Sequence, residues 1–280
     1  MTHARVQDAH YMARALELAR RGRETTPPNP CVGCVLVRGD TVVGEGWHRR
    51  AGEPHAEVHA LRAAGTGAAG ATCYVTLEPC AHTGRTPPCA DALIAAGVAR
   101  VVVGMEDPNP LVQGAGMARL RAAGITVEQN VLQAEAEALN PGFLQRMRKR
   151  RPWVRVKLAA TLDGRSATAQ GESQWITSEP ARVDVQQYRA RASAILTGVA
   201  TVLADNPRLN LRPPRERMPL RIVLDSSLRT PPGSALFGTP GAVLVVTTTM
   251  APEGAERALV GAGAEILRLP AERGRVALGP

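Results

Sequence analysis

The sequence predicts an α/β protein with two domains, and three observations support this prediction. The chain has 280 residues, whereas a single domain usually has about 100–200. Apolar residues at helical spacing alternate with short apolar runs typical of strands, which favours a sheet covered by helices on both faces. A basic run over residues 146–151 ends at Pro152, as a helix end and linker would. We therefore expect domains over residues 1–150 and 151–280.

The first domain begins with a helix, since apolar residues recur at three- and four-residue spacing from Val6 to Ala19. Two apolar runs at 32–37 and 42–46, joined by a Gly-Asp turn, then predict a β-hairpin. Helices and strands alternate beyond it. The expected helices cover residues 57–64, 90–96, 117–123 and 132–148, and the expected strands cover residues 72–76, 100–104 and 125–127.

The second domain is richer in strands. Proline-rich loops separate its apolar runs, and one helix is expected over residues 179–190. The expected strands cover residues 154–160, 194–196, 220–224, 242–247 and 266–269.

The net positive charge of the chain limits the classes of molecule that it is expected to bind. The formal net charge of +9 comes from 34 Lys and Arg against 25 Asp and Glu, and both halves carry a share of it. Three Trp, three Tyr and two Phe are too few to interleave with the basic residues, so phosphorylated small molecules fit this charge as well as RNA does. Contact with phosphate or nucleic acid is the alternative interpretation of the run 146–151. We expect a phosphorylated small-molecule substrate, and neither a nucleic-acid nor a membrane partner.

Hydropathy and cysteine usage predict the compartment. No stretch of about 18 apolar residues occurs, as a membrane span requires, and the first residues are polar instead of forming a leader. Five cysteines are an odd number, which fits metal ligands or buried thiols better than disulfides. We therefore expect a cytoplasmic protein, and a homo-oligomer.

Three residues with metal-ligating side chains are the strongest chemical signal in the sequence. His55 is followed 25 residues later by Cys80, and Cys89 lies nine positions further on. One imidazole and two thiolates suit Zn²⁺, and three protein ligands leave the fourth tetrahedral position for water, as in catalytic zinc sites. Glu57 is close enough in sequence to reach that water and to move its proton to a ring nitrogen and then to a leaving amine. This arrangement is typical of zinc deaminases.

The alternative for these residues is a closed structural zinc site or a group of buried thiols. A closed site needs a fourth ligand, for which His59 and His82 are the nearby candidates, but neither explains Glu57. Cys31, Cys34 and Cys73 are interpreted as core residues, because residues three apart on a strand point to opposite faces. The glycines at 114 and 116 indicate a helix start rather than a dinucleotide-binding loop, and His48 fits a pocket or the surface equally well.

At these motifs the chain resembles the bifunctional deaminase/reductase family of riboflavin biosynthesis. The matching segments in the first half are 28–33, 51–60, 76–80, 84–89 and 107–110, and those in the second half are 157–164, 171–177 and 201–207. The long spacing between Cys80 and Cys89 departs from common zinc deaminases but is a feature of this family.

The resemblance implies a three-layer α/β/α cytidine-deaminase-like domain followed by a dihydrofolate-reductase-like α/β domain. It implies two consecutive reactions on one phosphorylated pyrimidine. The ring 2-amino group is removed by hydrolysis with Zn²⁺, and the ribosyl side chain is then reduced to ribityl by NADPH. In the first reaction His55, Cys80 and Cys89 would hold zinc and Glu57 would move protons.

The resemblance also implies binding residues. Those for the deaminase substrate are Asn29, His48, Arg85 and Asn109. Those for NADPH are Ala159, Trp175, Thr201, Asp205 and Ser226. Those for the reductase substrate are Lys157, Ser173, Arg189, Leu209 and Arg212. Paired arginines suit a sugar phosphate, because each guanidinium presents a fork of donors.

The second half departs from the family at one point. The family's reductase continues into a Glu-Gly/Ala-Gly-Pro loop that supports the NADPH phosphates and supplies a glutamate to the substrate. This sequence ends at Leu278-Gly279-Pro280 before such a motif. We therefore expect a C-terminally incomplete reductase domain, in a chain that deaminates but reduces poorly.

Two other functions stay open at this point. A deaminase of cytidine, or of adenosine in tRNA, would use the same zinc chemistry, with the basic charge as its only support. A zinc-stabilised binding module is the alternative outside enzymes, and a Glu57→Gln substitution separates it from a catalyst.

Overall fold

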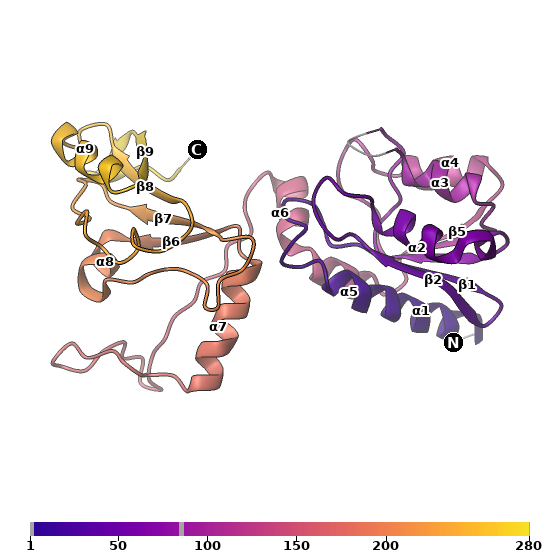
Figure 1. Cartoon of the computed structure of the whole chain (residues 1–280), viewed down its shortest axis with the longest axis horizontal. Helices are drawn as coiled ribbons and strands as arrows, with labels where there is room; N and C mark the ends of the chain where they lie inside the picture. Colours follow the sequence, from indigo (N-terminus) through magenta and orange to yellow (C-terminus); the bar gives the residue numbers. More distant parts are fainter. Residues whose placement is uncertain (1–2, 84–86, 280) are drawn as a thin grey trace. The chain divides into compact units, whose positions relative to one another are not determined.

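The structure is a computed structural model that describes residues 3–83 and 87–279. It divides into two compact units, Met1–Val156 and Lys157–Pro280, and each unit has a sheet of its own (Figure 1). Within the described residues, no helix is both long and apolar enough to cross a membrane.

The first unit is a three-layer α/β/α structure. Its strands are β1 (Gly33–Arg38), β2 (Thr41–Trp47), β3 (Thr72–Val75), β4 (Arg100–Val103) and β5 (Thr126–Glu128). Its α-helices are α1 (His3–Arg20), α2 (Ala56–Ala64), α3 (Cys89–Ala95), α4 (Ala115–Ala122), α5 (Gln133–Leu139) and α6 (Pro141–Lys149), and a short 3-10 helix covers Gly65–Ala68. The strand order is β2-β1-β3-β4-β5, with β1 antiparallel to both neighbours and β3, β4 and β5 parallel.

The two faces of this sheet carry separate cores. Helices α1, α5 and α6 cover one face, and α2, α3 and α4 cover the other (Figure 1). Cys31, which lies just before β1, packs in the first core, and Cys34 on β1 packs in the second. The Sγ atom of Cys34 lies 3.4 Å from that of Cys73 across the β1–β3 pair. These three cysteines are core residues, as predicted.

Glycines on β2 let α2 lie directly against the sheet. A Cβ atom at Gly46 would stand 2.4 Å from the Ala56 carbonyl oxygen and 2.5 Å from the Ala60 nitrogen. Gly44 is equally close to the backbone of α2, with the Ala60 oxygen at 2.3 Å. Since a side chain would push the helix away, these glycines allow α2 to lie in backbone contact with β2.

One predicted helix of the first unit is wrong in its extent. The pattern predicts a single helix over residues 132–148, whereas α5 and α6 are separated at Asn140. The Asn140 side chain accepts a hydrogen bond from the Cys31 backbone nitrogen (2.7 Å) and donates one to the Cys31 oxygen (2.9 Å). Pro141 then begins α6. The break occurs because this tertiary contact and the proline outweigh the helical periodicity.

The second unit is built on a parallel sheet with the strand order β6-β7-β8-β9. These strands are β6 (Ala194–Gly198), β7 (Leu220–Leu224), β8 (Val243–Thr248) and β9 (Ala264–Leu269), and a two-stranded ribbon pairs β10 (Ala271–Glu272) with β11 (Arg275–Val276). Its helices are α7 (Glu179–Arg191), α8 (Val199–Asp205) and α9 (Glu253–Gly261). The helices α8 and α9 and the β10–β11 ribbon are additions to the prediction.

The strand predicted over residues 154–160 is absent. This segment is irregular, and Val154, Val156 and Leu158 are 71–85% exposed. Alternating apolar residues favour an extended backbone, but a strand also needs a hydrogen-bonded neighbour. The described strands β6 to β9 pair only with one another.

Candidate metal and catalytic site

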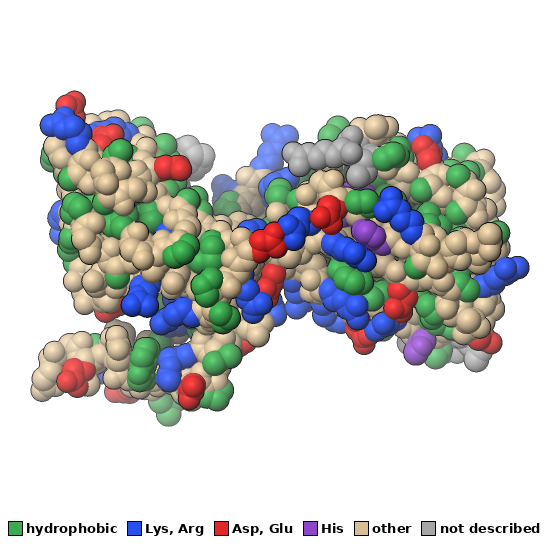
Figure 2. All heavy atoms as spheres, viewed as in Figure 1, with side chains coloured by type: hydrophobic (Ala, Val, Ile, Leu, Met, Phe, Trp, Pro, Cys, Tyr) green, Lys and Arg blue, Asp and Glu red, His purple; other side chains and the backbone are tan. Residues whose placement is uncertain are grey.

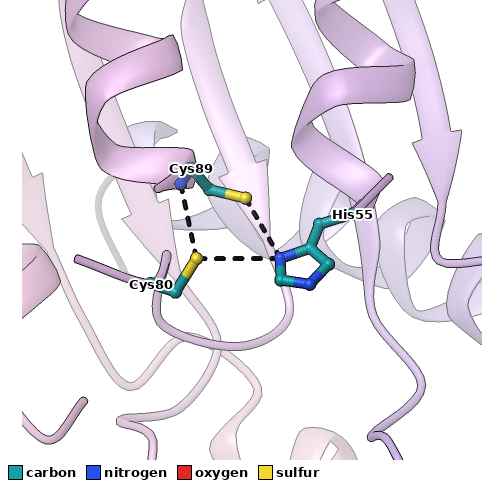
Figure 3. Close-up of side chains that lie close together, drawn as sticks. All are labelled: His55, Cys80 and Cys89. Atoms are coloured by element: carbon teal, nitrogen blue, oxygen red, sulfur yellow. Dashed lines mark hydrogen bonds between the residues drawn. The ribbon is translucent and has the colours of Figure 1, made fainter. Parts of the chain in front are cut away.

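Two helices and the connection that follows β3 bring three metal-ligating side chains together. His55 is the N-cap residue of α2, and Cys89 is the first residue of α3. Cys80 lies on the connection between β3 and α3, where its oxygen accepts a hydrogen bond from the Ala90 nitrogen (3.1 Å). The potential ligand atoms of the three residues all lie within 4.8 Å of one another (Figure 3).

The side chains of this trio point toward one another. The Nδ1 atom of His55 lies 3.2 Å from the Sγ atom of Cys89 and 3.7 Å from that of Cys80. The Cys89 backbone N–H donates to the Cys80 sulfur at 3.4 Å (Figure 3). Cys80 and Cys89 therefore place their sulfurs beside the same histidine nitrogen, although they are nine residues apart in the sequence.

The hydrogen bonds within the trio lower the pKa of the Cys80 thiol. Its pKa falls to about 4, because Cys89 and His55 hydrogen-bond to the thiolate and outweigh the effect of burial. The hydrogen bond with Cys80 raises the pKa of His55, and the proximity of Cys80, followed by burial, raises the pKa of Cys89. Cys80 is therefore a thiolate at neutral pH, which is the form that ligates metals.

The donor set fits Zn²⁺ and an open site. One ring nitrogen and two sulfurs are a usual ligand combination for catalytic zinc. Among the described residues, no fourth His, Cys, Asp or Glu belongs to this group. The two candidates for a closed site, His59 and His82, lie outside it. The described residues thus offer three ligands, with no support for a closed site.

Glu57 lies in the first turn of α2 beside the trio. Its side chain is buried, which raises the pKa of the carboxyl group. One of its oxygens, Oε2, makes no hydrogen bond with any described residue. A buried carboxylate oxygen without a partner suits an exchangeable ligand such as a water molecule or a substrate ring nitrogen.

Asn29 and His48 form one wall next to the trio. The Nδ2 atom of Asn29 lies 3.3 Å from Nε2 of His48, whose Nδ1 lies 3.2 Å from the Pro54 oxygen. The His48 ring is edge-on to the His55 ring, with centroids 5.3 Å apart. His48 is buried, which lowers its pKa. The sequence left open whether His48 lies in a pocket or on the surface; in the structure it is buried and lies beside His55.

Asn109 belongs to the connection between β4 and α4. Its backbone nitrogen donates to Oδ1 of Asp107 at 2.8 Å. Burial, with smaller contributions from the charges of Glu78 and Cys80, raises the pKa of Asp107 to about 6. Arg85, also expected at the substrate, lies outside the described residues.

Sequence reasoning missed Asp107 and Glu78, although both lie in segments that carry the family resemblance. Asp107 and Glu78 are not His or Cys residues, and their positions do not continue the spacing of His55, Cys80 and Cys89. Glu78 lies only two residues before Cys80, but the proximity of Asp107 to this pair depends on the parallel pairing of β3 with β4, which no local pattern reveals.

In the second unit, three of the five residues expected at NADPH follow strands at one edge of the sheet. Thr201 and Asp205 lie one turn apart on α8, directly after β6, and Ser226 follows β7. The carboxyl ends of neighbouring parallel strands meet at one edge, where open α/β sheets bind ligands. Ala159 and Trp175 instead lie on the irregular part of the chain before α7, with Trp175 stacked against Arg182.

Three of the residues expected at the reductase substrate lie together. Arg189 on α7 donates to the Asn210 oxygen (2.9 Å), which places it against the segment with Leu209 and Arg212. Burial and, to a smaller extent, the charge of Arg212 lower the pKa of Arg189. Lys157 and Ser173 lie on the irregular segment before α7, and no hydrogen bond of the described residues connects their side chains with this group.

Two family models match the chain. The model of the cytidine and deoxycytidylate deaminase zinc-binding region matches residues 5–105, and that of the RibD C-terminal domain matches residues 152–273. These matches confirm the expected fold class, in which a cytidine-deaminase-like domain precedes a dihydrofolate-reductase-like one. The second match disfavours a simple deaminase of cytidine or tRNA adenosine, which does not need that domain.

Curated relatives and solved structures agree with the family models. The riboflavin biosynthesis protein RibD of Escherichia coli (strain K12) is 59% identical over 249 residues, which are 84% of this chain and 68% of that protein. RibD of Haemophilus influenzae is 52% identical over 86% of this chain and 68% of its own length. The structure of Acinetobacter baumannii RibD, form 1, matches with a TM-score of 0.85 and 46% identity, over 96% of this chain and 75% of that one.

A further solved structure has a title that describes both activities. A diaminohydroxyphosphoribosylaminopyrimidine deaminase/5-amino-6-(5-phosphoribosylamino)uracil reductase from Thermotoga maritima matches with a TM-score of 0.83 and 37% identity, over 97% of this chain and 83% of that one. Family models, relatives and structures thus agree over both units: the chain belongs to the RibD family of riboflavin biosynthesis proteins, which joins a zinc-dependent deaminase to an NADP-dependent reductase.

Proposed function

We propose that the chain catalyses two consecutive reactions on one diaminopyrimidine that carries a ribosyl phosphate. The first unit, with a boundary near residue 150, removes the ring 2-amino group by hydrolysis, and the second reduces the ribosyl side chain to ribityl with NADPH. The observation that carries this proposal is the convergence of His55, Cys80 and Cys89 beside the buried Glu57, in a chain that also has a RibD C-terminal domain.

The deamination needs an activated water and a route for its proton. When bound by His55, Cys80 and Cys89, zinc lowers the pKa of a water molecule so that it can attack near neutral pH. With its unpartnered oxygen, Glu57 accepts one proton of that water and delivers it to the ring nitrogen, and it then transfers the second proton, from the new hydroxyl group, to the amine. A carbon–oxygen bond replaces the carbon–nitrogen bond, and ammonia leaves.

Binding residues orient the pyrimidine in this scheme. Asn29 and His48 contact one side of the substrate, since their joined side chains stand next to His55. Asn109 contacts it from the β4–α4 connection, and Arg85 is the fourth substrate-binding residue.

The second unit supplies the residues for the reduction. Those that hold NADPH are Ala159, Trp175, Thr201, Asp205 and Ser226. Those that hold the substrate are Lys157, Ser173, Arg189, Leu209 and Arg212. The positive charges of Arg189 and Arg212 are close to each other, which favours a phosphate between them.

A coupled assay with separate readouts tests the proposal. The purified chain is given the diaminopyrimidine ribosyl phosphate, and ammonia release and NADPH consumption are followed independently. We expect ammonia release that Glu57→Gln reduces by about 10³-fold or more while bound zinc stays at the wild-type level. Unchanged turnover in that variant would exclude the catalytic role of Glu57 and favour a binding module.

We further propose that the chain is a cytoplasmic homo-oligomer. Cysteine thiolates that ligate a metal require a reducing compartment, and all five cysteines are free thiols. Exposed apolar side chains on the second unit, such as Leu158, Leu162 and Leu196, favour burial against another copy. Sedimentation equilibrium of the purified chain gives the number of copies, and a monomer at micromolar concentration would contradict the assembly.

A further inference from the structure

Glu78 is a buried carboxylate that the reaction scheme does not use. It lies between the end of β3 and the ligand Cys80, and only 4% of it is exposed. No ion pair among the described residues involves it. Four backbone amides satisfy it instead: those of Gly116 (3.0 Å) and Met117 (3.2 Å) donate to Oε1, and those of Asp107 (3.2 Å) and Gly114 (3.0 Å) donate to Oε2.

All four amides belong to the segment 105–117, which connects β4 with α4 and forms the first turn of that helix. The Glu78 backbone nitrogen also donates to the Met105 oxygen at 3.0 Å. The Glu78 carboxylate therefore binds both ends of this connection and holds them next to Glu78 and Pro79, which precede Cys80.

The 105–117 segment holds Asp107 and the proposed substrate-binding residue Asn109. Asp107 lies close enough to Cys80 for their charges to interact. The backbone nitrogen of Asn109 is bound by Asp107, and its Oδ1 accepts from the Leu111 nitrogen. Its side-chain amide nitrogen makes no hydrogen bond with the described residues, and so it is free for a substrate acceptor.

Two further contacts keep the same segment against the cysteine connection. A Cβ atom at Gly116 would stand 1.8 Å from the Pro79 oxygen, so α4 begins in direct backbone contact with the residue before Cys80. Arg119 donates to the Ala81 oxygen at 3.2 Å and pairs with Asp91 on α3 at 2.6 Å.

We propose that Glu78 is a positioning residue of the deaminase site, whose carboxylate sets the position of Asp107 and Asn109 relative to Cys80. This inference rests on the proposed function, since it assigns the segment a substrate-binding role. A carboxylate is required because only an acceptor with two oxygens can satisfy four N–H groups. A glutamine would turn its own NH₂ group toward two of them and leave those amides without an acceptor.

The test compares the zinc-loaded Glu78→Gln protein with the wild type. We expect KM for the diaminopyrimidine ribosyl phosphate to rise about tenfold or more, with a smaller loss in kcat and one zinc per chain. Amide hydrogen exchange at residues 107 and 114–117 should accelerate at least tenfold, whereas exchange in α1 stays unchanged. A KM within twofold of the wild-type value, or unchanged exchange in the segment, would overturn the proposal.

Glu45→Gln is the matched control. Glu45 is a partly buried carboxylate on β2 that binds Arg14 of α1 through two hydrogen bonds (2.7 and 2.9 Å) and, among the described residues, no amide of the segment 105–117. Its substitution should leave both KM and the exchange of 105–117 unchanged. An equal rise in KM in this control would show a general effect of destabilisation and refute the specific role of Glu78.

A second variant covers the case in which Glu78→Gln does not fold. Arg119 is 47% exposed, so Arg119→Ala keeps the core and removes only the outer contact. We expect a rise in KM of about two- to fivefold and faster amide exchange in 105–117. If KM and exchange both stay at their wild-type values, the proposal is contradicted. If the wild type releases no ammonia, the proposed function fails, and the exchange measurement alone still decides whether Glu78 holds the segment.

Discussion

At the scale of single residues, the first unit depends on buried charges that have partners. Asp8 of α1 accepts two hydrogen bonds from Arg100 (2.7 and 2.8 Å) and one from the Tyr74 hydroxyl (3.0 Å). This group joins α1 to β3 and β4 on the face of the sheet opposite α2. The hydrogen bond from Arg100 is the largest cause that lowers the pKa of Asp8.

The lowered pKa of Asp8 predicts how stability depends on pH. A carboxyl group with a lower pKa in the folded state contributes stability above its unfolded value of about 3.9, and this contribution is lost as pH falls toward the folded value. We expect Asp8→Asn to lower the free energy of unfolding by about 1–3 kcal/mol at pH 7. The difference from the wild type should shrink below about pH 4, as measured by urea unfolding across pH. A constant difference would contradict the role of the charge.

At the scale of elements, the site depends on where α2 and α3 begin. His55 and Glu57 lie at the first turn of α2, and Cys89 begins α3. The position of α2 follows from the missing side chain at Gly46, which brings the helix backbone against β2. Displacement of the start of α2 would move His55, the proposed ligand, and Glu57, the proposed proton-transfer residue, together.

The close packing of α2 predicts a loss of metal affinity on substitution of Gly46. Gly46→Ala introduces a Cβ atom at 2.4 Å from the Ala56 oxygen, and overpacking of this kind costs about 1–3 kcal/mol. We expect weaker zinc binding in a chelator competition and a lower Tm. Gly67→Ala is the control, because its Cβ would meet Val43 at 3.4 Å, an ordinary contact. Equal zinc affinity in the two variants would argue against this account.

At the scale of the whole molecule, the two units have separate cores. One sheet and two hydrophobic clusters belong to the first unit, and another sheet with its own cluster belongs to the second. The proposed zinc ligands His55, Cys80 and Cys89 all lie in the first unit. Lys and Arg side chains are interspersed with Asp and Glu on the visible face (Figure 2), which agrees with a charge spread over the chain instead of a single basic patch.

Separate cores predict that removal of zinc destabilises one unit. A metal that binds the folded state but not the unfolded state adds to the stability of the folded state. In differential scanning calorimetry, we expect a chelator to lower the Tm of one transition and to leave a second transition in place. A uniform shift of a single transition would show that the two units unfold as one.

Much of the first unit could be predicted because its signals are local. The trio of His55, Cys80 and Cys89 is identified by residue type and spacing, and α2, α3 and α4 follow helical periodicity closely. Local patterns do not predict the extent of an element where a contact with a distant residue interrupts it. The helix expected over residues 132–148 is interrupted by the contact of Asn140 with Cys31, 109 positions away.

The second unit was harder to predict, because alternation of apolar residues does not identify the partner of a strand. The run over 154–160 has the pattern of a strand and yet lacks a ladder in the described chain. The sequence by itself determined the chemistry, since ligand type, the nearby Glu57 and the order of helices and strands depend on neighbouring residues. Only the tertiary structure decided that Glu78 binds amides about 30 to 40 residues later and that Asn29 meets His48. Such contacts arise from strand pairing and backbone packing, and these depend on residues far apart in the sequence.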